Sequence, residues 1–361
     1  MTNSGGAQSI RVVIIGEYSP PFAGMAVQAE ALMTIHDPKL VTTRKIGTNY
    51  YFKGPFSFLN RIRGLRGLLR YIAFLVQLRK IFSVDIIHVF SSSGLNFYLF
   101  TVVPILLSRL AGIPLIINYH GGNAGAFFQN RVSLLDWSLK KNTSLVVPSG
   151  FLQDIFREFG KESFIIPNVI KTDRFEFVKR NVFRPVIVVC RNFTPVYNVG
   201  CAIKAFDIVS KECENAKLIL AGDGPERKDL EALVQKLGLQ NVQFLGNIPN
   251  EQMNAVYQSA DIFLNTSRVD NMPNCILEAM ACGLPVISTD VGGIPYLVTN
   301  TKTGLLAPSD DSARLAELIL KVIGHENYAR ELVEAAYASL QHYTANSVRK
   351  NWLEYYQTLC R

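Results

Sequence analysis

Short, largely apolar runs recur along this chain, and each is followed by a polar turn and a segment with apolar residues at helical spacing. These runs lie at 11–16, 84–90, 115–118, 185–190, 217–221 and 261–265. Runs that are apolar at successive positions are typical of strands buried on both faces of a parallel sheet. The alternation of such strands with helices predicts an α/β fold. At 361 residues, with about 150 residues per domain, the chain is expected to form two domains.

One strand–helix–strand unit near the middle of the second half carries two carboxylates. After the strand at 261–265, the pattern predicts a loop, then a helix at 275–282 that Asn274 N-caps and Gly283 ends. Asp270 is placed on the loop, and Glu278 about one turn into the helix.

The start of this predicted helix suits a nucleotide. Met272, Pro273 and Asn274 lead into it, and the free backbone N–H groups of residues near Met272 to Cys275 favour a phosphate. A carboxylate beside them, such as Glu278, can accept hydrogen bonds from both hydroxyls of a ribose.

The wider motif resembles a known family. Asp270-x7-Glu278, followed by Ala-Met-Ala-Cys-Gly-Leu-Pro-Val and by Gly292-Gly293, is similar to the Glu-x7-Glu signature of retaining glycosyltransferases of family 4, which have the GT-B fold. The first acid is Asp270 where the family has Glu. The resemblance implies two doubly wound, Rossmann-like domains that face each other across a cleft. We expect the first at 1–170, the second at 171–345, and a helix at 346–361 that crosses back to the first.

The resemblance also implies roles for residues elsewhere. In the first domain, Gly24 matches a glycine that approaches the donor diphosphate, and His120, in Tyr-His-Gly-Gly-Asn, matches a histidine that contacts the transferred sugar. In the second, Arg191 matches a phosphate-binding arginine, and the loops at Gly222 and Ile248 would wall the nucleobase pocket.

One expected residue is missing from this set. The family usually has a lysine a few residues after the arginine, and here Tyr197 stands near its place, in a sub-branch pattern Arg-Asn-x4-Tyr-Asn. A tyrosine hydroxyl can hydrogen-bond a phosphate but brings no charge. The pattern therefore predicts either another design of the phosphate site or a loss of activity.

Charge is unevenly distributed along the chain, whose net charge is +8. Residues 1–180 contain 21 Lys and Arg but only 10 Asp and Glu. Residues 181–361 contain 16 Lys and Arg and 19 Asp and Glu, so the basic excess lies in the first half. Within the first half, residues 53–80 hold seven bases and no acid, interleaved with apolar residues at helical spacing. We expect this segment to lie on the anionic inner face of a membrane, at about 1 kcal/mol per base; a packed helix with a solvated basic face is the alternative. No recognition motif points to nucleic acid.

Other features narrow the location and the chemistry. Pro104 and Gly112 interrupt the apolar stretch 95–117, so we expect a helix and a strand and no membrane span. The six cysteines form no CxxC pair or regular framework, and no signal peptide is recognised, so we expect a reducing, cytoplasmic setting with peripheral membrane contact. Neither a metal-binding cluster nor a DxD pair is recognised, so no metal and no cofactor are expected.

These observations predict a metal-independent, retaining glycosyltransferase. The donor is a nucleotide sugar, UDP-sugar being favoured and GDP-sugar possible, and the acceptor a saccharide, expected to be lipid-linked, in cell-surface polysaccharide or lipopolysaccharide assembly. His120, Arg191, Asp270 and Glu278 form the expected catalytic set. The alternatives are a non-catalytic nucleotide-sugar-binding scaffold, a GT-B epimerase and a phosphorylase. A nicotinamide dehydrogenase is disfavoured, because no G-x-G-x-x-G follows the first strand.

Overall fold

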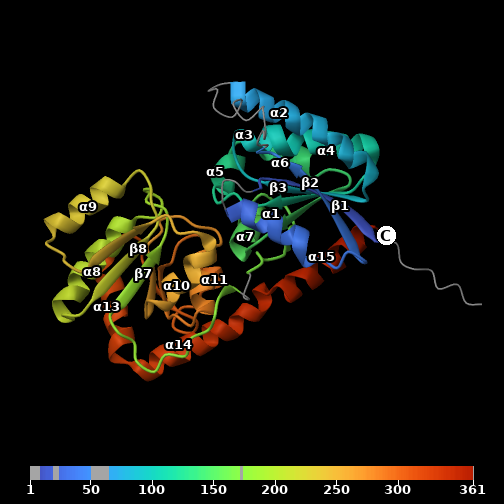
Figure 1. Ribbon diagram of the computed structural model, residues 1–361. Helices are drawn as coiled ribbons and strands as arrows, with labels where there is room; N and C mark the ends of the chain where they lie inside the picture. Colours follow the sequence, from blue (N-terminus) through green and yellow to red (C-terminus); the bar gives the residue numbers. More distant parts are fainter. Residues whose placement is uncertain (1–8, 19–23, 50–64, 171–173, 361) are drawn as a thin grey trace, which may run out of the picture. The chain divides into compact units, whose positions relative to one another are not determined.

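The structure, a computed structural model, describes residues 9–18, 24–49, 65–170 and 174–360 (Figure 1). It divides into two compact units. Unit 1 comprises Met1–Val169 together with Ala345–Arg361, and unit 2 comprises Ile170–Thr344.

Unit 1 is built on a parallel six-stranded sheet in the order β2-β1-β3-β4-β5-β6. Its strands are β1 (Ile10–Gly16), β2 (Val41–Gly47), β3 (Ile86–Ser91), β4 (Leu115–Tyr119), β5 (Thr143–Val147) and β6 (Phe164–Ile165). Its α-helices are α1 (Gly24–Ile35), α2 (Leu65–Gln77), α3 (Leu95–Phe97), α4 (Val103–Ala111), α5 (Ala124–Gln129), α6 (Val132–Ser138), α7 (Gly150–Glu158) and α15 (Ala345–Leu359). A 3₁₀ helix (Leu78–Ser83) follows α2, and a π-helical turn (Tyr98–Val102) joins α3 to α4.

Unit 2 repeats this plan in the order β12-β11-β10-β7-β8-β9, again all parallel. Its strands are β7 (Val186–Cys190), β8 (Lys217–Ala221), β9 (Val242–Gly246), β10 (Ile262–Asn265), β11 (Val286–Thr289) and β12 (Leu305–Ala307). Its α-helices are α8 (Val199–Glu212), α9 (Arg227–Lys236), α10 (Met253–Gln258), α11 (Asn274–Ala281), α12 (Ile294–Leu297), α13 (Ser312–Gly324) and α14 (Glu326–Ser339). Short 3₁₀ helices lie at Asn250–Gln252 and Leu340–Tyr343.

Both faces of each sheet are covered, which explains the continuous apolar strands. In β7, Ile187 and Val189 belong to the core shared with α8 and α13, whereas Val188 and Cys190 belong to the core shared with α10 and α11. Successive side chains of a strand point to opposite faces, so every position of the strand must be apolar.

The C-terminal helix α15 belongs to unit 1. Its residues Trp352 and Tyr356 are buried in the core shared with α1 and with one face of the sheet. The Tyr356 hydroxyl lies 2.8 Å from Nδ1 of His88, a buried residue of β3. The predicted fold class, with two Rossmann-like units and a C-terminal helix that returns to the first, is confirmed.

Two local predictions meet different outcomes. The apolar stretch 95–117 folds as α3, the π-helical turn, α4 and the start of β4, and within the described residues no helix is both long and apolar enough to cross a membrane. The predicted N-cap of α11 was wrong by one residue: Pro273 is the N-cap, without a side-chain cap, and Asn274 is the first helical residue. Pro273 has the extended backbone that is typical of an N-cap (φ −70°, ψ 111°), and the helical backbone begins at Asn274.

Candidate active site

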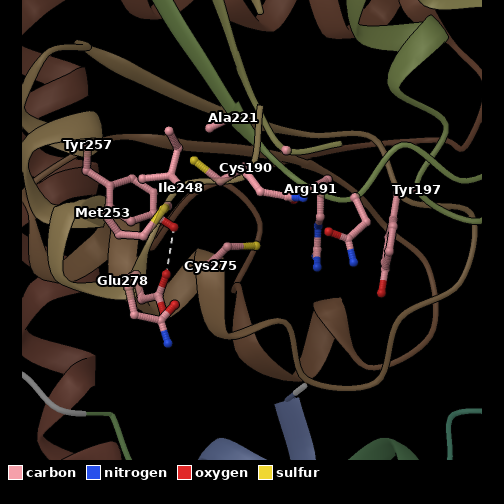
Figure 2. A pocket seen from close by; sticks show the side chains of 13 residues that line it. Cys190, Arg191, Tyr197, Ala221, Ile248, Met253, Tyr257, Cys275 and Glu278 are labelled. Carbon is pink, nitrogen blue, oxygen red and sulfur yellow. Dashed lines mark hydrogen bonds between the residues drawn. The ribbon is translucent and has the colours of Figure 1, made fainter. Parts of the chain in front are cut away.

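A cavity of about 240 Å³ opens in unit 2 where β7 and β8 end. The strand order reverses here, because β8 lies on one side of β7 and β10 on the other. In parallel α/β sheets, ligands bind outside the carboxyl ends of the strands at such a reversal. The cavity is lined by Cys190, Arg191, Asn192, Tyr197, Ala221, Gly222, Asn247, Ile248, Asn250, Met253, Tyr257, Cys275 and Glu278 (Figure 2).

Arg191 is the cationic group of this cavity. Its Nη2 lies 2.8 Å from Asp270 Oδ2, in an ion pair of two largely buried side chains. Its Nε donates to Asn265 Oδ1 at 2.9 Å, and Asn265 is itself held by Ser267 and Ser288. Burial lowers the pKa of the guanidinium, but interactions with neighbouring titratable groups, first Cys275 and then Asp270, outweigh this effect and raise that pKa above its usual value. Arg191 is therefore a fixed, permanently charged donor.

Tyr197 lies beside Arg191 and extends in the same direction into the cavity (Figure 2). The Arg191 guanidinium carbon lies 4.8 Å from the centre of the tyrosine ring, a cation–π contact. Burial raises the pKa of the Tyr197 hydroxyl, so the group keeps its proton at neutral pH and can donate a hydrogen bond.

Glu278 lies on α11 at the other end of the cavity, where Tyr257 of α10 binds it. The buried Tyr257 hydroxyl donates to Glu278 Oε2 at 2.7 Å (Figure 2). Burial raises the pKa of the Glu278 carboxyl, and the bond from Tyr257 opposes that rise. The second carboxylate oxygen is left for a further donor, such as a hydroxyl of a ligand.

Glycines bring the loops close enough to form this site. Gly222 has φ +151°, and a Cβ there would lie 1.9 Å from the Arg191 carbonyl oxygen, so only glycine fits. The Gly293 N–H donates to the Asp270 carbonyl at 2.8 Å, and a Cβ on Gly293 would lie 1.7 Å from the Asn271 carbonyl oxygen. The two glycines at 292–293 therefore hold the backbone that carries Asp270.

The residues inferred from sequence do not all meet in this cavity. Arg191, Tyr197, Gly222, Ile248 and Glu278 line it, and Asp270 adjoins it through Arg191. Met272, Pro273 and Asn274 form the start of α11 and do not line it, although the next residue, Cys275, does.

His120 and Gly24 lie in unit 1. His120 follows β4, and its backbone N–H donates to the Ser91 carbonyl at 2.9 Å, while its ring stacks on Phe90 at 5.1 Å. Burial lowers the pKa of His120 to about 4, so its imidazole is neutral at pH 7. Gly24 is the exposed first residue of α1, and the preceding residues 19–23 lie outside the described part of the chain.

Several residues of the site were missed from sequence, and Tyr257 and Asn265 bear most directly on its chemistry. Tyr257 lies in a six-residue helix with no recognisable motif, so nothing marked it. Asn265 gave a usable signal, because it is a polar side chain at the end of an otherwise apolar, fully buried strand.

Two protein-family models match this chain. The model described as "Glycosyl transferases group 1" matches residues 171–339, and the model described as "Glycosyltransferase Family 4" matches residues 19–174. The chain belongs to glycosyltransferase family 4. The two matches meet where unit 1 gives way to unit 2.

Two curated relatives each match less than half of the chain. N-acetyl-α-D-glucosaminyl L-malate synthase of Bacillus anthracis is 33% identical over 156 residues, which are 43% of this chain and 40% of that protein. GalNAc-α-(1→4)-GalNAc-α-(1→3)-diNAcBac-PP-undecaprenol α-1,4-N-acetyl-D-galactosaminyltransferase of Campylobacter jejuni is 32% identical over 142 residues, 39% of each protein. The matched part of the family 4 chain thus spans about two fifths of the length of these relatives.

The fold is shared over the full length with a solved structure. Alr3699/HepE from Anabaena, in complex with UDP, has a TM-score of 0.76 and 19% sequence identity, and the alignment covers 97% of this chain and 100% of that one. At this identity the likeness concerns the fold.

Proposed function

We propose that this family 4 chain transfers a sugar from a nucleotide-sugar donor to a saccharide acceptor, with retention at the anomeric carbon and without a divalent metal ion. The observation that carries the proposal is the cavity at the strand-order reversal of unit 2. It holds a fixed guanidinium and a phenol at one end and a partly satisfied carboxylate at the other. These groups match a diphosphate and a ribose, the two constant parts of any nucleotide sugar.

The difficult step in this reaction is the departure of the nucleoside diphosphate. Negative charge grows on the phosphate oxygens while the sugar gains oxocarbenium character, so prearranged donors at the phosphate lower the barrier, typically by about 3 kcal/mol each. Arg191 and Tyr197 would provide such donors in unit 2, together with the N–H groups at the start of α11. Gly24 of unit 1 would approach the same diphosphate.

The remaining roles concern the two sugars. Glu278 would accept hydrogen bonds from the ribose hydroxyls, with Tyr257 holding it in position. Asp270 would hold the transferred sugar, and the neutral His120 would donate to one of its hydroxyls. The loop at Ile248 would contact the nucleobase.

A UDP-sugar is the favoured donor, and a GDP-sugar is the second choice. The fold of Alr3699/HepE, which was solved with UDP and with UDP-glucose, supports this preference. A lipid-linked saccharide is the proposed acceptor, in the assembly of a cell-surface polysaccharide or lipopolysaccharide. The Campylobacter jejuni relative, whose name includes an undecaprenol-linked saccharide, supports that acceptor class.

Membrane contact would bring the chain to such an acceptor. Residues 53–64 of the basic segment, with Lys53, Arg61 and Arg63, lie outside the described residues. The described part supports the proposal, because the solvent face of α2 is apolar: Leu68, Ile72 and Val76 are exposed although Phe74 is fully buried beneath them. The bases at 79–80 follow directly. Such a face suits an anionic bilayer, and the chain would act at the cytoplasmic side, where its six free cysteines are stable.

The donor test is a thermal-shift and hydrolysis screen against UDP-, GDP-, ADP- and dTDP-sugars, with a chelator present. The proposal expects one nucleotide class to raise the melting temperature, and Glu278→Ala to abolish the effect. Glu317→Ala, which removes an exposed carboxylate of α13, is the matched control. Binding without turnover, with membrane extract as acceptor, would support a scaffold; conversion of the donor sugar without transfer would support an epimerase. If no nucleotide binds, the assignment fails.

The membrane proposal has its own test. Ile72→Glu with Val76→Glu should abolish co-sedimentation with vesicles rich in anionic lipid and leave nucleotide binding intact. Val182→Glu, at an equally exposed apolar position of unit 2, should change neither. Unaltered sedimentation of the α2 variant would refute contact through this face.

A further inference from the structure

Tyr197 takes its position from the loop that runs from the end of β7 to the start of α8. Short polar contacts from the segment after β10 hold the backbone of this loop. The Arg268 Nη1 donates to the Pro195 carbonyl at 3.0 Å, and the Arg268 backbone N–H donates to the Val196 carbonyl at 2.7 Å. The buried Thr266 hydroxyl lies 3.1 Å from the Tyr197 carbonyl oxygen and 2.9 Å from that of Asn198. Four successive carbonyls of the loop are thus engaged.

A third loop, which follows β12, completes the arrangement. Both carboxylate oxygens of Asp310 accept from the Arg268 guanidinium, at 2.6 to 3.2 Å. Asp310 Oδ1 also accepts from Asn198 Nδ2 at 2.9 Å. Asn198 and Asp310 both have left-handed backbones, with φ of +48° and +63°, a conformation that Asn and Asp adopt more readily than most residues other than glycine. We call Thr266, Arg268, Asn198 and Asp310 the loop clamp.

We infer that Arg268 and Asp310 are positioning residues for the donor site: through the loop clamp they set where the Tyr197 ring lies beside Arg191. Neither lines the cavity. This inference rests on the proposed function, in which the Tyr197 hydroxyl serves a donor phosphate.

The physical reason is that this chain has Tyr197 near the position where the family resemblance implies a lysine. A lysine reaches a phosphate on four flexible bonds and can correct for a misplaced backbone. A tyrosine has two side-chain torsions and a rigid ring, so its hydroxyl goes where the backbone directs it. A chain with tyrosine at this position therefore needs a loop whose backbone is fixed.

The first test follows the loop itself and needs no ligand. In hydrogen–deuterium exchange of the full chain, Arg268→Gln should speed exchange of the amides at 194–200 at least tenfold. Arg314→Gln breaks an equally exposed arginine–carboxylate pair of unit 2, with Glu317, and should leave those amides unchanged. Equal exchange in wild type and Arg268→Gln would overturn the clamp, whether or not the chain binds nucleotides.

The second test follows the donor site by calorimetry with UDP. Arg268→Gln should weaken UDP binding roughly three- to tenfold, and Tyr197→Ala should weaken it by a similar factor. The double variant should bind UDP no more weakly than the single variant with the lower affinity, because the effects of residues that act through one another are not additive. Asp310→Asn, which keeps an oxygen for Asn198, should retain more affinity than Asp310→Ala. Multiplied effects in the double variant would show that Arg268 does not act through Tyr197. Absence of UDP binding in wild type would instead count against the proposed function and leave the exchange result standing.

Discussion

The Arg191–Asp270 ion pair sets up a competition within the proposed donor site. Both groups are assigned to the donor, Arg191 to its phosphate and Asp270 to its sugar, yet they also form an ion pair with each other at 2.8 Å. A diphosphate that takes up the guanidinium must share it with the carboxylate. We therefore expect Asp270→Asn to tighten the binding of UDP, the opposite of what is expected when a binding residue is removed.

The geometry gives a magnitude. Unit charges about 4 Å apart interact by roughly 4 kcal/mol at an effective dielectric constant of about 20, and the cost of burying both charges offsets a large part of this attraction. If about 1.4 kcal/mol, roughly a third of the attraction, is released, the affinity changes about tenfold. Asn265 still holds Nε of Arg191 in the variant, so the guanidinium should keep its position. UDP should thus bind roughly tenfold tighter.

The prediction for Asp270→Asn is tested by two measurements, calorimetry of UDP binding and the rate of sugar transfer from a UDP-sugar. Transfer should fall by about a hundredfold or more in Asp270→Asn, because the proposed contact with the transferred sugar loses its charge. Asp207→Asn, which breaks the pair with Lys211 on α8, is the control and should alter neither quantity. If Asp270→Asn binds UDP no tighter than wild type, the carboxylate does not compete for Arg191 and the reasoning is wrong.

Two further predictions concern stability. Arg180→Met should cost about 3–5 kcal/mol in urea unfolding, because this buried guanidinium pairs with the buried Asp261 carboxylate and also donates to carbonyls at the ends of α10 and α11. Arg184→Met removes the other partner of Asp261 at a side chain that is 65% exposed and should cost less than about 1 kcal/mol. Burial lowers the pKa of His36 and of His120 to about 4, so the stability that their neutral forms provide is present above about pH 6.5 and is lost as the pH falls toward 4. Unfolding at pH 5 should show a loss of about 2 kcal/mol per histidine relative to pH 7.5, and replacement of both by Gln should remove that loss; an unchanged pH dependence would contradict it.

The sequence was most informative where one local pattern has one physical cause. The apolar runs predicted the parallel strands, because a strand that is covered on both faces has no solvent-exposed side chains and is therefore apolar at successive positions. Arg191, Gly222 and Glu278, far apart in the chain, line the same cavity because each follows a strand at the same edge of the sheet or lies on a helix beside it.

Contacts between distant residues without a local pattern could not be predicted. Tyr257 binds Glu278 from a separate short helix, and Arg268 reaches Asp310 from another loop. Such pairs depend on how loops pack after the sheet has formed. The buried His88 was likewise not recognised as a partner of the C-terminal helix, since its role exists only once that helix has packed.

The return of α15 to unit 1 has a consequence for the order in which the chain acquires structure during synthesis. Unit 2 is one continuous stretch, and all of it leaves the ribosome before α15 does. Unit 1 is translated first, but its core stays incomplete until Trp352 and Tyr356 arrive and cover the face around His88. Bringing together segments so far apart in sequence is slow. The second unit of the protein can therefore mature before the first, and a nascent chain exposes an apolar face of unit 1, open to chaperones, throughout the translation of unit 2.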